Sequence, residues 1–326
     1  MKKIGAFIPV RPDYHLQITD PAAAVGCLRP PLHDALWAYL RAQPDIEWID
    51  HLNFHRALLH HGEVWCGDIC LNALDAFIWY SEVDRTPGSF DLQALKTLAR
   101  KVPVVRNPTT FETALDKYTA HLTLLDSGVN VAESVLFDYR VPHRMAEVLD
   151  TWGAAVLKPR RGGWGKGVTL IDHAGALRDT IGYLQSIAGN SPDQGYFLER
   201  YYPNDLDRWA SLTMIDGEVM YGYRKLAAKQ YDMGGGRLKI LDAEEKGGGI
   251  VQADLVDEHY RQAEMAYRAL PIGLIGFDMI WVEGRPLVVD ENTSPGNYAE
   301  LYAQVGIEPG ARLGEWLLSE VRRAKK

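Results

Sequence analysis

The sequence has few cysteines and no long apolar run. Three cysteines among 326 residues, Cys27, Cys66 and Cys70, are an odd number in a long chain. That count does not suit a disulfide framework and favours a reducing compartment, so we expect a cytoplasmic protein. No stretch approaches about 18 uninterrupted apolar residues, and the apolar run at the N-terminus is far too short for a signal peptide. We therefore expect no membrane span and no membrane partner.

An excess of basic charge is lacking too. Lys and Arg total 35 against 43 for Asp and Glu, a net charge of -8, and the basic residues are scattered along the chain. Scattered basic residues argue against nucleic acid as the main partner. With 47% hydrophobic and 24% charged residues, the composition is that of a soluble globular protein, and its length suits two or three lobes.

Strand and helix patterns alternate over the first hundred residues. Continuous apolar runs at residues 4–10 and 75–80 predict buried strands, and the stretches at residues 30–43 and 91–101 predict helices. Apolar strands that alternate with helices predict a mainly parallel α/β layer.

Farther along, the pattern changes to isolated helices and hairpins. Thr109 and Glu112 have the spacing of a capping box, which predicts the start of one long helix that Gly128 ends. Asp216-Gly217 between two apolar stretches predicts a tight hairpin turn.

A glycine-rich loop lies in the stretch VLKPRRGGWGKGVTLI. Its glycines are Gly162, Gly163, Gly165 and Gly167. Glycines let backbone N–H groups approach an anion closely, and Lys158 and Lys166 add positive charge. The spacing is not GxxxxGK[ST] and no helix follows directly, so this is not the strand–loop–helix phosphate site. We predict a flap between two antiparallel strands that folds over phosphates. The alternative is a solvated hairpin loop with surface lysines.

The stretch GFDMIWVEGRPLVVDENTSPG, residues 276–296, predicts a hairpin with acidic groups at the two ends that its turn brings together. Side chains two apart on a strand share a face, so Asp290 and Asn292 point together and Glu291 points away. Asp278 on the partner strand joins the pair. Three oxygen-bearing side chains at one place suit Mg²⁺, which takes its remaining ligands from water and substrate phosphates. The alternative is a group of capping carboxylates at a strand end.

A zinc site at His60, His61, Cys66 and Cys70 is a weaker hypothesis. The Cys-x-x-x-Cys spacing is unlike the usual zinc knuckle, and EVWCGDICL predicts a hairpin, so core cysteines are favoured.

Four motifs follow one another along the chain: Asp116-Lys117, V-L-K-P-x-x-G-G-x-G-x-G-V, F-L-E-R-Y, and G-F-D…D-E-N-T-S-P-G. Together they resemble the ATP-grasp superfamily, most closely its RimK-like and glutathione-synthetase-like ligases, over essentially the whole chain. The resemblance implies an α/β ATP-grasp fold with three lobes. These are an N-terminal parallel α/β substrate lobe (1–108), a central lobe with the flap (109–196) and a C-terminal lobe with the metal-binding hairpin (197–326). The last two would clasp the nucleotide.

The resemblance also implies roles for individual residues. Those that would bind ATP are Lys117, Lys158, Gly163, Gly165, Lys166, Gly167, Leu198, Glu199, Arg200, Tyr201 and Asp207. Within this set, Lys117 and Lys158 would contact phosphates. The segment from Leu198 to Tyr201 would hold adenine by backbone hydrogen bonds, and Asp207 would lie near the ribose. Arg224 and Lys158 would be catalytic, with Arg224 facing the γ-phosphate.

The same resemblance implies two Mg²⁺ ions, with Mn²⁺ as an alternative, on Asp278, Asp290 and Asn292. RimK-like ligases usually have Glu-x-Asn where this chain has Asp290-Glu291-Asn292, a departure that leaves open whether Glu291 replaces Asp290 at the metal. We prefer Asp290, because Glu291 points to the other face of a regular strand.

The activity that the resemblance implies is ATP-dependent joining of a carboxylate to an amine through an acyl phosphate, with release of ADP and phosphate. The partners would be small-molecule acid and amine substrates such as amino acids or short peptides, and dimers are common among such ligases. Residues proposed to contact substrate are Arg11, Arg85, Ser294 and Asn297. The alternatives are an ATP-grasp kinase that phosphorylates a hydroxyl, and an ATP-binding regulatory protein without turnover.

Overall fold

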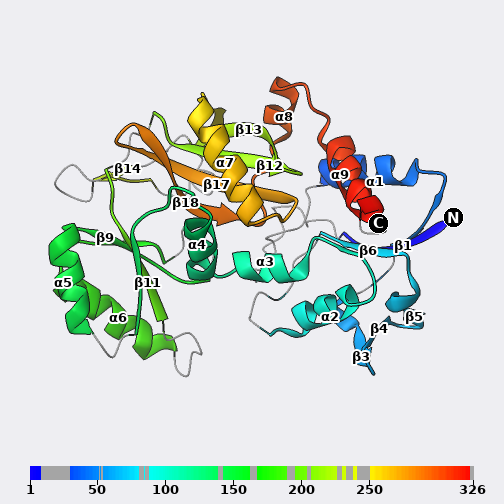
Figure 1. The fold of residues 1–326 in the computed structure, drawn as a ribbon, viewed down its shortest axis with the longest axis horizontal. Coiled ribbons are helices and arrows are strands. Elements are labelled where there is room, and N and C mark those ends of the chain that lie inside the picture. Colours follow the sequence, from blue (N-terminus) through cyan, green and yellow to red (C-terminus); the bar gives the residue numbers. More distant parts are fainter. Residues whose placement is uncertain are drawn as a thin grey trace.

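A computed structural model of the protein describes residues 1–8, 30–50, 52, 54–80, 84, 88–138, 142–161, 167–188, 195–203, 207–225, 230–232, 238–240 and 250–323. Among these residues it contains three main sheets and two small ones (Figure 1). Within the described part of the chain, no helix combines the length and the apolar character that crossing a membrane requires.

The first sheet has four parallel strands in the order β2-β1-β6-β7. Its strands are β1 (Lys2–Phe7), β2 (Ile46–Ile49), β6 (Ala76–Trp79) and β7 (Val104–Val105). Helices α1 (Pro30–Arg41) and α9 (Pro309–Arg323) cover one face and α2 (Phe90–Ala99) covers the other, as Figure 1 shows. Ile78 packs toward α1 and α9, whereas its neighbours Phe77 and Trp79 pack toward α2. A parallel sheet buried on both faces needs the continuous apolar strands that the sequence has, and the predicted parallel layer is confirmed.

A small antiparallel sheet contacts α2 through β4 (Glu63–Cys66). Its strands are β3 (Leu58–His60), β4 and β5 (Ile69–Cys70), between the short 3-10 helices η2 (Phe54–Arg56) and η3 (Leu71–Ala73). The predicted hairpin through the two cysteines is confirmed. Burial raises the pKa of the Cys66 thiol to about 11, as for a core cysteine. No group of three or more His, Cys, Asp or Glu suited to a metal occurs among the described residues, so nothing there supports the zinc hypothesis.

The second sheet is antiparallel, in the order β10-β9-β11-β8. Its strands are β8 (Ser134–Asp138), β9 (Ala155–Lys158), β10 (Thr169–Ile171) and β11 (Gly195–Arg200). Helices α5 (Pro142–Trp152) and α6 (Ala174–Ala188) pack on one face through their apolar side chains (Figure 1). Because β9 and β10 are antiparallel neighbours, the glycine-rich loop joins two antiparallel strands, as predicted.

The third sheet is antiparallel, in the order β16-β13-β12-β17-β18. Its strands are β12 (Ala210–Ile215), β13 (Glu218–Lys225), β16 (Ile250–Gln252), β17 (Leu274–Val282) and β18 (Arg285–Asn292). Helices α4 (Lys117–Asp126) and α7 (Asp257–Ala269) pack beside it (Figure 1). The remaining elements are β14 (Gln230–Asp232), which pairs with β15 (Leu238–Ile240), and the short helix α8 (Ala299–Gln304).

Both predicted hairpins of this sheet are confirmed, and their turns have the same geometry. Asp216 and Gly217 have φ of 52° and 84°, and Glu283 and Gly284 have φ of 50° and 84°. Positive φ at both central residues matches the right-handed twist of the flanking strands.

The predicted long helix from Thr109 to Gly128 is wrong, because the chain forms two helices there. Asn107 caps α3 (Pro108–Ala114), because its side-chain oxygen accepts hydrogen bonds from the backbone N–H groups of Thr109 and Thr110. Asn107 rather than Thr109 is therefore the capping residue. Asp116 then caps α4. A second cap in mid-sequence moves Lys117 from the middle of a helix to its first turn.

The division of the chain at residues 108/109 and 196/197 stays a prediction. β11 crosses the second of these boundaries within the second sheet, and α9, at the end of the chain, packs on the first sheet.

Candidate functional site

Lys117 lies at the first turn of α4 and faces the end of β18. Asp116 fixes this turn, because its side chain accepts hydrogen bonds from the N–H groups of Tyr118 and Thr119, both at 3.1 Å. Lys117 is nearly buried, at 9% exposed, and its ammonium donates to Oδ1 of Asp290. The helix cap therefore sets the position of a buried cation against the acidic end of the hairpin.

Two arginines fasten the start of the glycine-rich loop to the same helix turn. Arg160 and Arg161 follow β9, and their Nη2 atoms lie 2.5 Å and 3.3 Å from Oδ2 of Asp116. The carbonyl of Arg160 also accepts a hydrogen bond from the N–H of Lys117 at 2.8 Å. The base of the predicted flap and the start of α4 thus form one unit.

Lys158, at the end of β9, is a second nearly buried cation. Its Nζ lies 2.5 Å from Oε2 of Glu199 on the neighbouring strand β11, and it donates to the carbonyl of Val289 at 2.7 Å. Burial raises the pKa of Glu199 above its ordinary value, although Lys158 opposes the change. Lys158 therefore joins the second sheet to the acidic end of β18.

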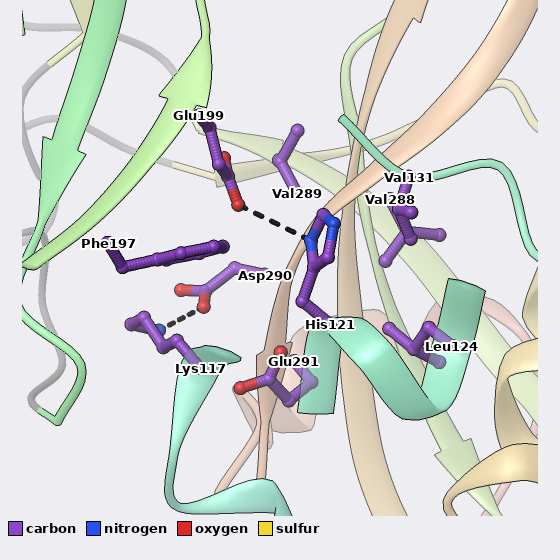
Figure 2. A pocket seen from close by; sticks show the side chains of 10 residues that line it. All are labelled: Lys117, His121, Leu124, Val131, Phe197, Glu199, Val288, Val289, Asp290 and Glu291. Atoms are coloured by element: carbon purple, nitrogen blue, oxygen red, sulfur yellow. Dashed lines mark hydrogen bonds and ion pairs between the residues drawn. The ribbon is translucent and has the colours of Figure 1, made fainter. Parts of the chain in front are cut away.

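His121 completes this buried group from α4. Its Nδ1 lies 3.8 Å from Oε1 of Glu199, and its Nε2 lies 2.9 Å from the hydroxyl of Ser134. Figure 2 shows the imidazole facing Glu199 across the top of the pocket. Burial, with the nearby charge of Lys158, lowers the pKa of His121 to about 4, so this ring is neutral at neutral pH.

The acidic end of the hairpin is gathered by strand pairing. Asp278 on β17 stands directly opposite Asp290 on β18. Oδ1 of Asp278 accepts hydrogen bonds from the hydroxyl of Ser211 at 2.6 Å and from the amide of Asn292 at 3.2 Å. The structure therefore brings Asp278, Asp290 and Asn292 together. Lys117 contacts Asp290, and Lys158 donates to the carbonyl of Val289, the residue before Asp290.

Glu291 lies on the other face of β18, opposite Phe277, as strand alternation predicts. It is 9% exposed and borders the same pocket as Asp290. Burial raises its pKa to about 8, Asp290 acts in the same direction, and Lys117 opposes both. For Lys117, burial favours the neutral form, but Asp290 and Glu291 outweigh it and raise the pKa above its ordinary value.

A cleft lies between the second and third sheets, beside α4. It holds about 240 Å³ of non-protein space, part of it open to solvent. Figure 2 shows both apolar and charged side chains around it. The lining residues are Lys117, His121, Leu124, Val131, Phe197, Glu199, Val288, Val289, Asp290 and Glu291. An apolar wall beside buried cations is suited to a flat ring that carries an anionic group.

The donor set at the hairpin end fits a hard divalent cation. Two carboxylates and one amide oxygen leave room for water and phosphate oxygens, which Mg²⁺ prefers. In the structure the ammonium of Lys117 contacts Asp290, so this carboxylate already faces positive charge from the cleft. Among the described residues no third His, Cys, Asp or Glu joins the pair, so protein atoms would supply only part of the coordination.

The predicted adenine-binding strand is largely occupied by its own sheet. Leu198 pairs with both β8 and β9, and the N–H groups of Arg200 and Tyr201 donate to the carbonyls of Glu133 and Ala154 at 2.8 Å and 3.0 Å. Adenine binding by this segment stays a prediction. It would have to use groups other than these two N–H donors.

The predicted catalytic arginine and ribose contact lie together. Nη1 of Arg224 on β13 is 3.2 Å from both the carboxylate and the carbonyl oxygen of Asp207. The Asp207 side chain is 94% exposed, so this ion pair is open to solvent. A ligand phosphate would therefore meet little resistance in drawing the arginine away.

Of the predicted substrate residues, two lie in the loop after β18. The amide of Asn297 donates to the hydroxyl of Tyr80 at 3.4 Å and accepts from the hydroxyl of Tyr302 at 3.1 Å, while Ser294 is half-buried. Gly167, with φ of 76°, occupies the turn before β10. Other predictions lie outside the described residues, namely Arg11, Arg85, Gly163, Gly165 and Lys166.

Sequence reasoning did not find His121, or the pairing of Arg160 and Arg161 with Asp116. His121 stands four residues after Lys117, so it shares a helix face with the predicted phosphate-binding lysine, and that spacing was the available signal. The two arginines carry no such signal, because their partner is distant in sequence.

No family model matches the chain. Among curated proteins, it is 25% identical over 213 residues to a probable alpha-L-glutamate ligase of Xanthomonas oryzae pv. oryzae, a match that covers 65% of this chain and 67% of that protein. Similar solved structures include the D-cycloserine synthetase DcsG, with a TM-score of 0.65 at 16% identity over 98% of this chain and 99% of that one. The D-alanine–D-alanine ligase from Bacillus anthracis has a TM-score of 0.64 at 16% identity, covering 100% and 99%. A RimK domain ATP-grasp protein from Sphaerobacter thermophilus has a TM-score of 0.62 at 14% identity, covering 96% and 98%.

The chain has the ATP-grasp fold along its whole length. The resemblance to RimK-like ATP-grasp ligases that its motifs predicted is confirmed by these relatives in sequence and structure.

Proposed function

We propose that this protein is an ATP-dependent carboxylate–amine ligase that forms an amide bond through an acyl-phosphate intermediate. One observation carries the proposal: two buried lysines from different elements converge on the acidic end of a single hairpin, beside a cleft with an apolar wall. The ligases among its relatives support the same class of reaction.

The reaction needs such a concentration of charge. A carboxylate and a phosphate oxygen about 4 Å apart repel by roughly 4 kcal/mol per charge pair at an effective dielectric near 20. Several such pairs form when an acid attacks the γ-phosphate of ATP, and the transition state spreads charge over the phosphoryl oxygens. Catalysis of this step is therefore a matter of positioning and neutralising charge.

In this proposal Lys117 and Lys158 bind ATP phosphates. Each already has an anionic partner in the protein, Asp290 for Lys117 and Glu199 for Lys158. A bound phosphate would join these partners rather than meet bare cations, so both lysines are held in place before the nucleotide arrives. Asp278, Asp290 and Asn292 would hold Mg²⁺, which supplies positive charge for the transferring phosphoryl group.

Arg224 is proposed to face the γ-phosphate, with its exposed pair to Asp207 exchanged for phosphate when ATP binds. The segment from Leu198 to Tyr201, which includes Glu199, is proposed to lie along adenine, with Phe197 and His121 on the pocket wall. The neutral imidazole of His121 adds no positive charge near the base, which suits an uncharged purine.

After phosphoryl transfer, an amine attacks the acyl carbon, a tetrahedral intermediate forms, and phosphate leaves. The amine loses a proton in this step, and the acyl–oxygen bond to phosphate breaks. We propose an amino acid or short peptide as the acid, by analogy with the probable glutamate ligase, and Ser294 and Asn297 as its contacts in the loop after β18.

The test is a phosphate-release screen over a matrix of amino acids and amines with ATP and Mg²⁺, followed by mass spectrometry of the positives. A ligase releases ADP and phosphate only when acid and amine are both present, and its product weighs one water less than the summed reactants. ADP without free phosphate, with a stable phosphorylated product, would instead indicate a kinase. Unchanged ATP across the whole matrix would contradict turnover altogether.

A matched pair of variants assigns the activity to the site. Asp278→Asn removes one charge from the hairpin end and should abolish product formation while it changes ADP affinity in the absence of metal by less than about threefold. Asp179→Asn makes the same change on an exposed position of α6 and should leave both properties at the wild-type level. Equal activity of the two variants would separate the hairpin end from the chemistry.

A further inference from the structure

A buried cation lies outside the cleft, where the first sheet meets the third. Arg106 directly follows β7 and is only 2% exposed. Its guanidinium carbon lies 5.3, 5.2 and 4.7 Å from the ring centroids of Trp79, Tyr80 and Phe111. A guanidinium stays charged in any protein environment, and three aromatic faces offer it electrostatic attraction in place of water. The position of this side chain is therefore closely defined.

The aromatic surroundings are themselves fixed. The indole N–H of Trp79 donates to the backbone carbonyl of Arg106 at 2.8 Å, and the Trp79 and Phe111 rings meet edge to face with centroids 4.8 Å apart. Trp79 lies on β6 of the first sheet and Phe111 on α3, and both belong to the hydrophobic core that also contains residues of α2. Arg106 thus belongs to a rigid group on the N-terminal side of the molecule.

From that group Arg106 reaches the chain that follows the acidic hairpin. Its Nη2 donates to the backbone carbonyl of Thr293, a residue that is 6% exposed. Thr293 is bonded directly to Asn292, one of the three proposed metal ligands. Charge-assisted hydrogen bonds from an ionised donor are stronger than neutral ones, so the contact holds the carbonyl firmly.

The far end of the same loop is held from the third sheet. The carbonyl of Gly296 accepts hydrogen bonds from the hydroxyls of Thr213 at 3.0 Å and Tyr221 at 2.6 Å. The hydroxyl of Tyr221 also accepts from the N–H of Tyr298 at 3.1 Å. The loop is therefore held at one end by Arg106, which follows β7 of the first sheet, and at the other end by Thr213 and Tyr221 of the third sheet. Arg106 is the anchor nearer the acidic end of β18.

We propose that Arg106 is a positioning residue that sets the acidic end of β18 for metal binding, acting through the Thr293 carbonyl. The proposal rests on the ligase function and metal site proposed above. Arg106 is not among the residues that line the cleft, and its described hydrogen bond goes to the Thr293 carbonyl, so the proposed effect passes through the backbone of Thr293 and Asn292. Groups that orient metal ligands from outside the coordination sphere typically change metal affinity or activity about 10- to 100-fold when they are removed.

The test measures metal binding directly, by electron paramagnetic resonance of bound Mn²⁺ with saturating ADP, beside kcat and KM for ATP. In Arg106→Met a side chain of similar length keeps the contact with the rings and loses the donor and the charge. Arg106→Lys keeps the charge but not the planar fork, and it remains informative if the Met variant does not fold. The matched control is Arg41→Met, because Arg41 also lies over an indole, 5.0 Å from the centroid of Trp37, but at an exposed position.

We expect the Mn²⁺ dissociation constant of Arg106→Met to rise about 10- to 100-fold and kcat to fall by a similar factor. Arg106→Lys should fall between wild type and Met, and Arg41→Met should match wild type. ADP affinity without metal should stay within about threefold, because the lysines are untouched. A smaller variant, Arg106→Ala, should regain Mn²⁺ affinity when ethylguanidine is added and not when ethylamine is added.

The outcomes separate the two proposals. If the wild type binds Mn²⁺ with ADP and forms product, and both Arg106→Met and Arg106→Lys match it within twofold, the role of Arg106 is refuted and the ligase function stands. If the wild type neither binds Mn²⁺ with ADP nor forms product, the proposed function fails and the positioning role fails with it. Loss of ADP affinity equal to the loss of metal affinity would indicate a general collapse of the site and would also overturn the positioning role.

Discussion

Replacing Lys158 by methionine would test whether the buried pair that joins the second sheet to β18 supports the fold as well as the site. The side chains of Lys158 and Glu199 are 10% and 6% exposed, and their charged atoms are 2.5 Å apart. The ammonium also donates to the Val289 carbonyl at 2.7 Å. The substitution removes the charge and both contacts while it keeps most of the apolar stem.

The size of the effect follows from two opposed contributions. At 2.5 Å and an effective dielectric near 20, the attraction of the pair is about 7 kcal/mol before the loss of hydration is counted. Loss of hydration offsets much of this, and removal of one partner from a buried pair typically costs about 3–5 kcal/mol because the other charge is left behind. Burial already raises the pKa of Glu199, so the carboxylate can protonate once Lys158 is gone, which limits the loss. We expect Lys158→Met to lose about 3 kcal/mol at pH 7.

A double-mutant cycle isolates the pair. Urea unfolding at 25 °C, without metal or nucleotide, would give the free energy of unfolding for Lys158→Met, Glu199→Gln and the double variant. With losses of about 3, 2 and 2 kcal/mol, the coupling would be about 3 kcal/mol. The exposed pair Lys3 and Glu47, 3.8 Å apart, serves as the control, and its cycle should give less than about 0.5 kcal/mol. Additive losses at Lys158 and Glu199, within about 0.5 kcal/mol, would refute the reasoning.

Three further predictions concern single residues. The pKa of His121 is lowered to about 4, so the unfolded chain takes up a proton between pH 6.5 and 4 that the folded chain refuses. Up to about 3 kcal/mol of the free energy of unfolding is therefore present above pH 6.5 and lost toward pH 4. His121→Gln should reduce this dependence of the free energy of unfolding on pH, measured by urea unfolding. An unchanged dependence would contradict the prediction. The pKa of Glu291 is raised to about 8, so stability is complete below about pH 4.5 and falls as the pH rises through 8. Glu291→Gln should have a larger free energy of unfolding than wild type at pH 8, by at most about 5 kcal/mol, and an equal one at pH 4. A variant that is more stable than wild type only at pH 4 would contradict the direction of this pKa shift. Asp116→Ala removes the cap of α4 and the partner of two arginines and should lower the free energy of unfolding by about 2 kcal/mol, whereas a loss below about 0.5 kcal/mol would show that the cap is dispensable.

Much of the architecture could be predicted from local patterns. The apolar strand at residues 75–80 and the turns at Gly217 and Gly284 depend on residues that are adjacent in sequence, and periodicity and turn chemistry record them. The break between α3 and α4 could not be predicted this way. Asp116 caps α4 there, but an aspartate within a helical pattern is equally typical of the exposed face of one continuous helix. The pairing of Asp116 with Arg160 and Arg161, which distinguishes the cap, depends on residues after β9 that are distant in sequence.

The candidate site was predictable in its residue types and less so in its contacts. Lys117, Lys158 and the acidic hairpin end could be named from motifs. That Lys117 contacts Asp290 while Lys158 contacts Glu199 and the Val289 carbonyl depends on how three sheets pack, which no local pattern encodes. Arg106 is the clearest case, because its donor reaches Thr293, 187 residues away.

The pairing of β17 with β18 shows how one residue decides the arrangement of the site. Val288 pairs with Met279 and Asp290 pairs with Asp278, so the register shifts by one and Val289 is an extra residue in β18. In a regular strand Val288 and Asp290 would share a face, and a strand that buried Val288 in the core would bury Asp290 beside it. The extra residue places Val288, 1% exposed, on the core face with Met279 and Phe277, and turns Asp290 to the face of Asp278. Glu291 then returns to the core face, opposite Phe277, where burial keeps its carboxyl protonated to about pH 8. Strand alternation separates the two adjacent carboxylates, and the one-residue irregularity decides which of them lies on the face of Asp278. This is why Asp290 rather than Glu291 is the proposed ligand.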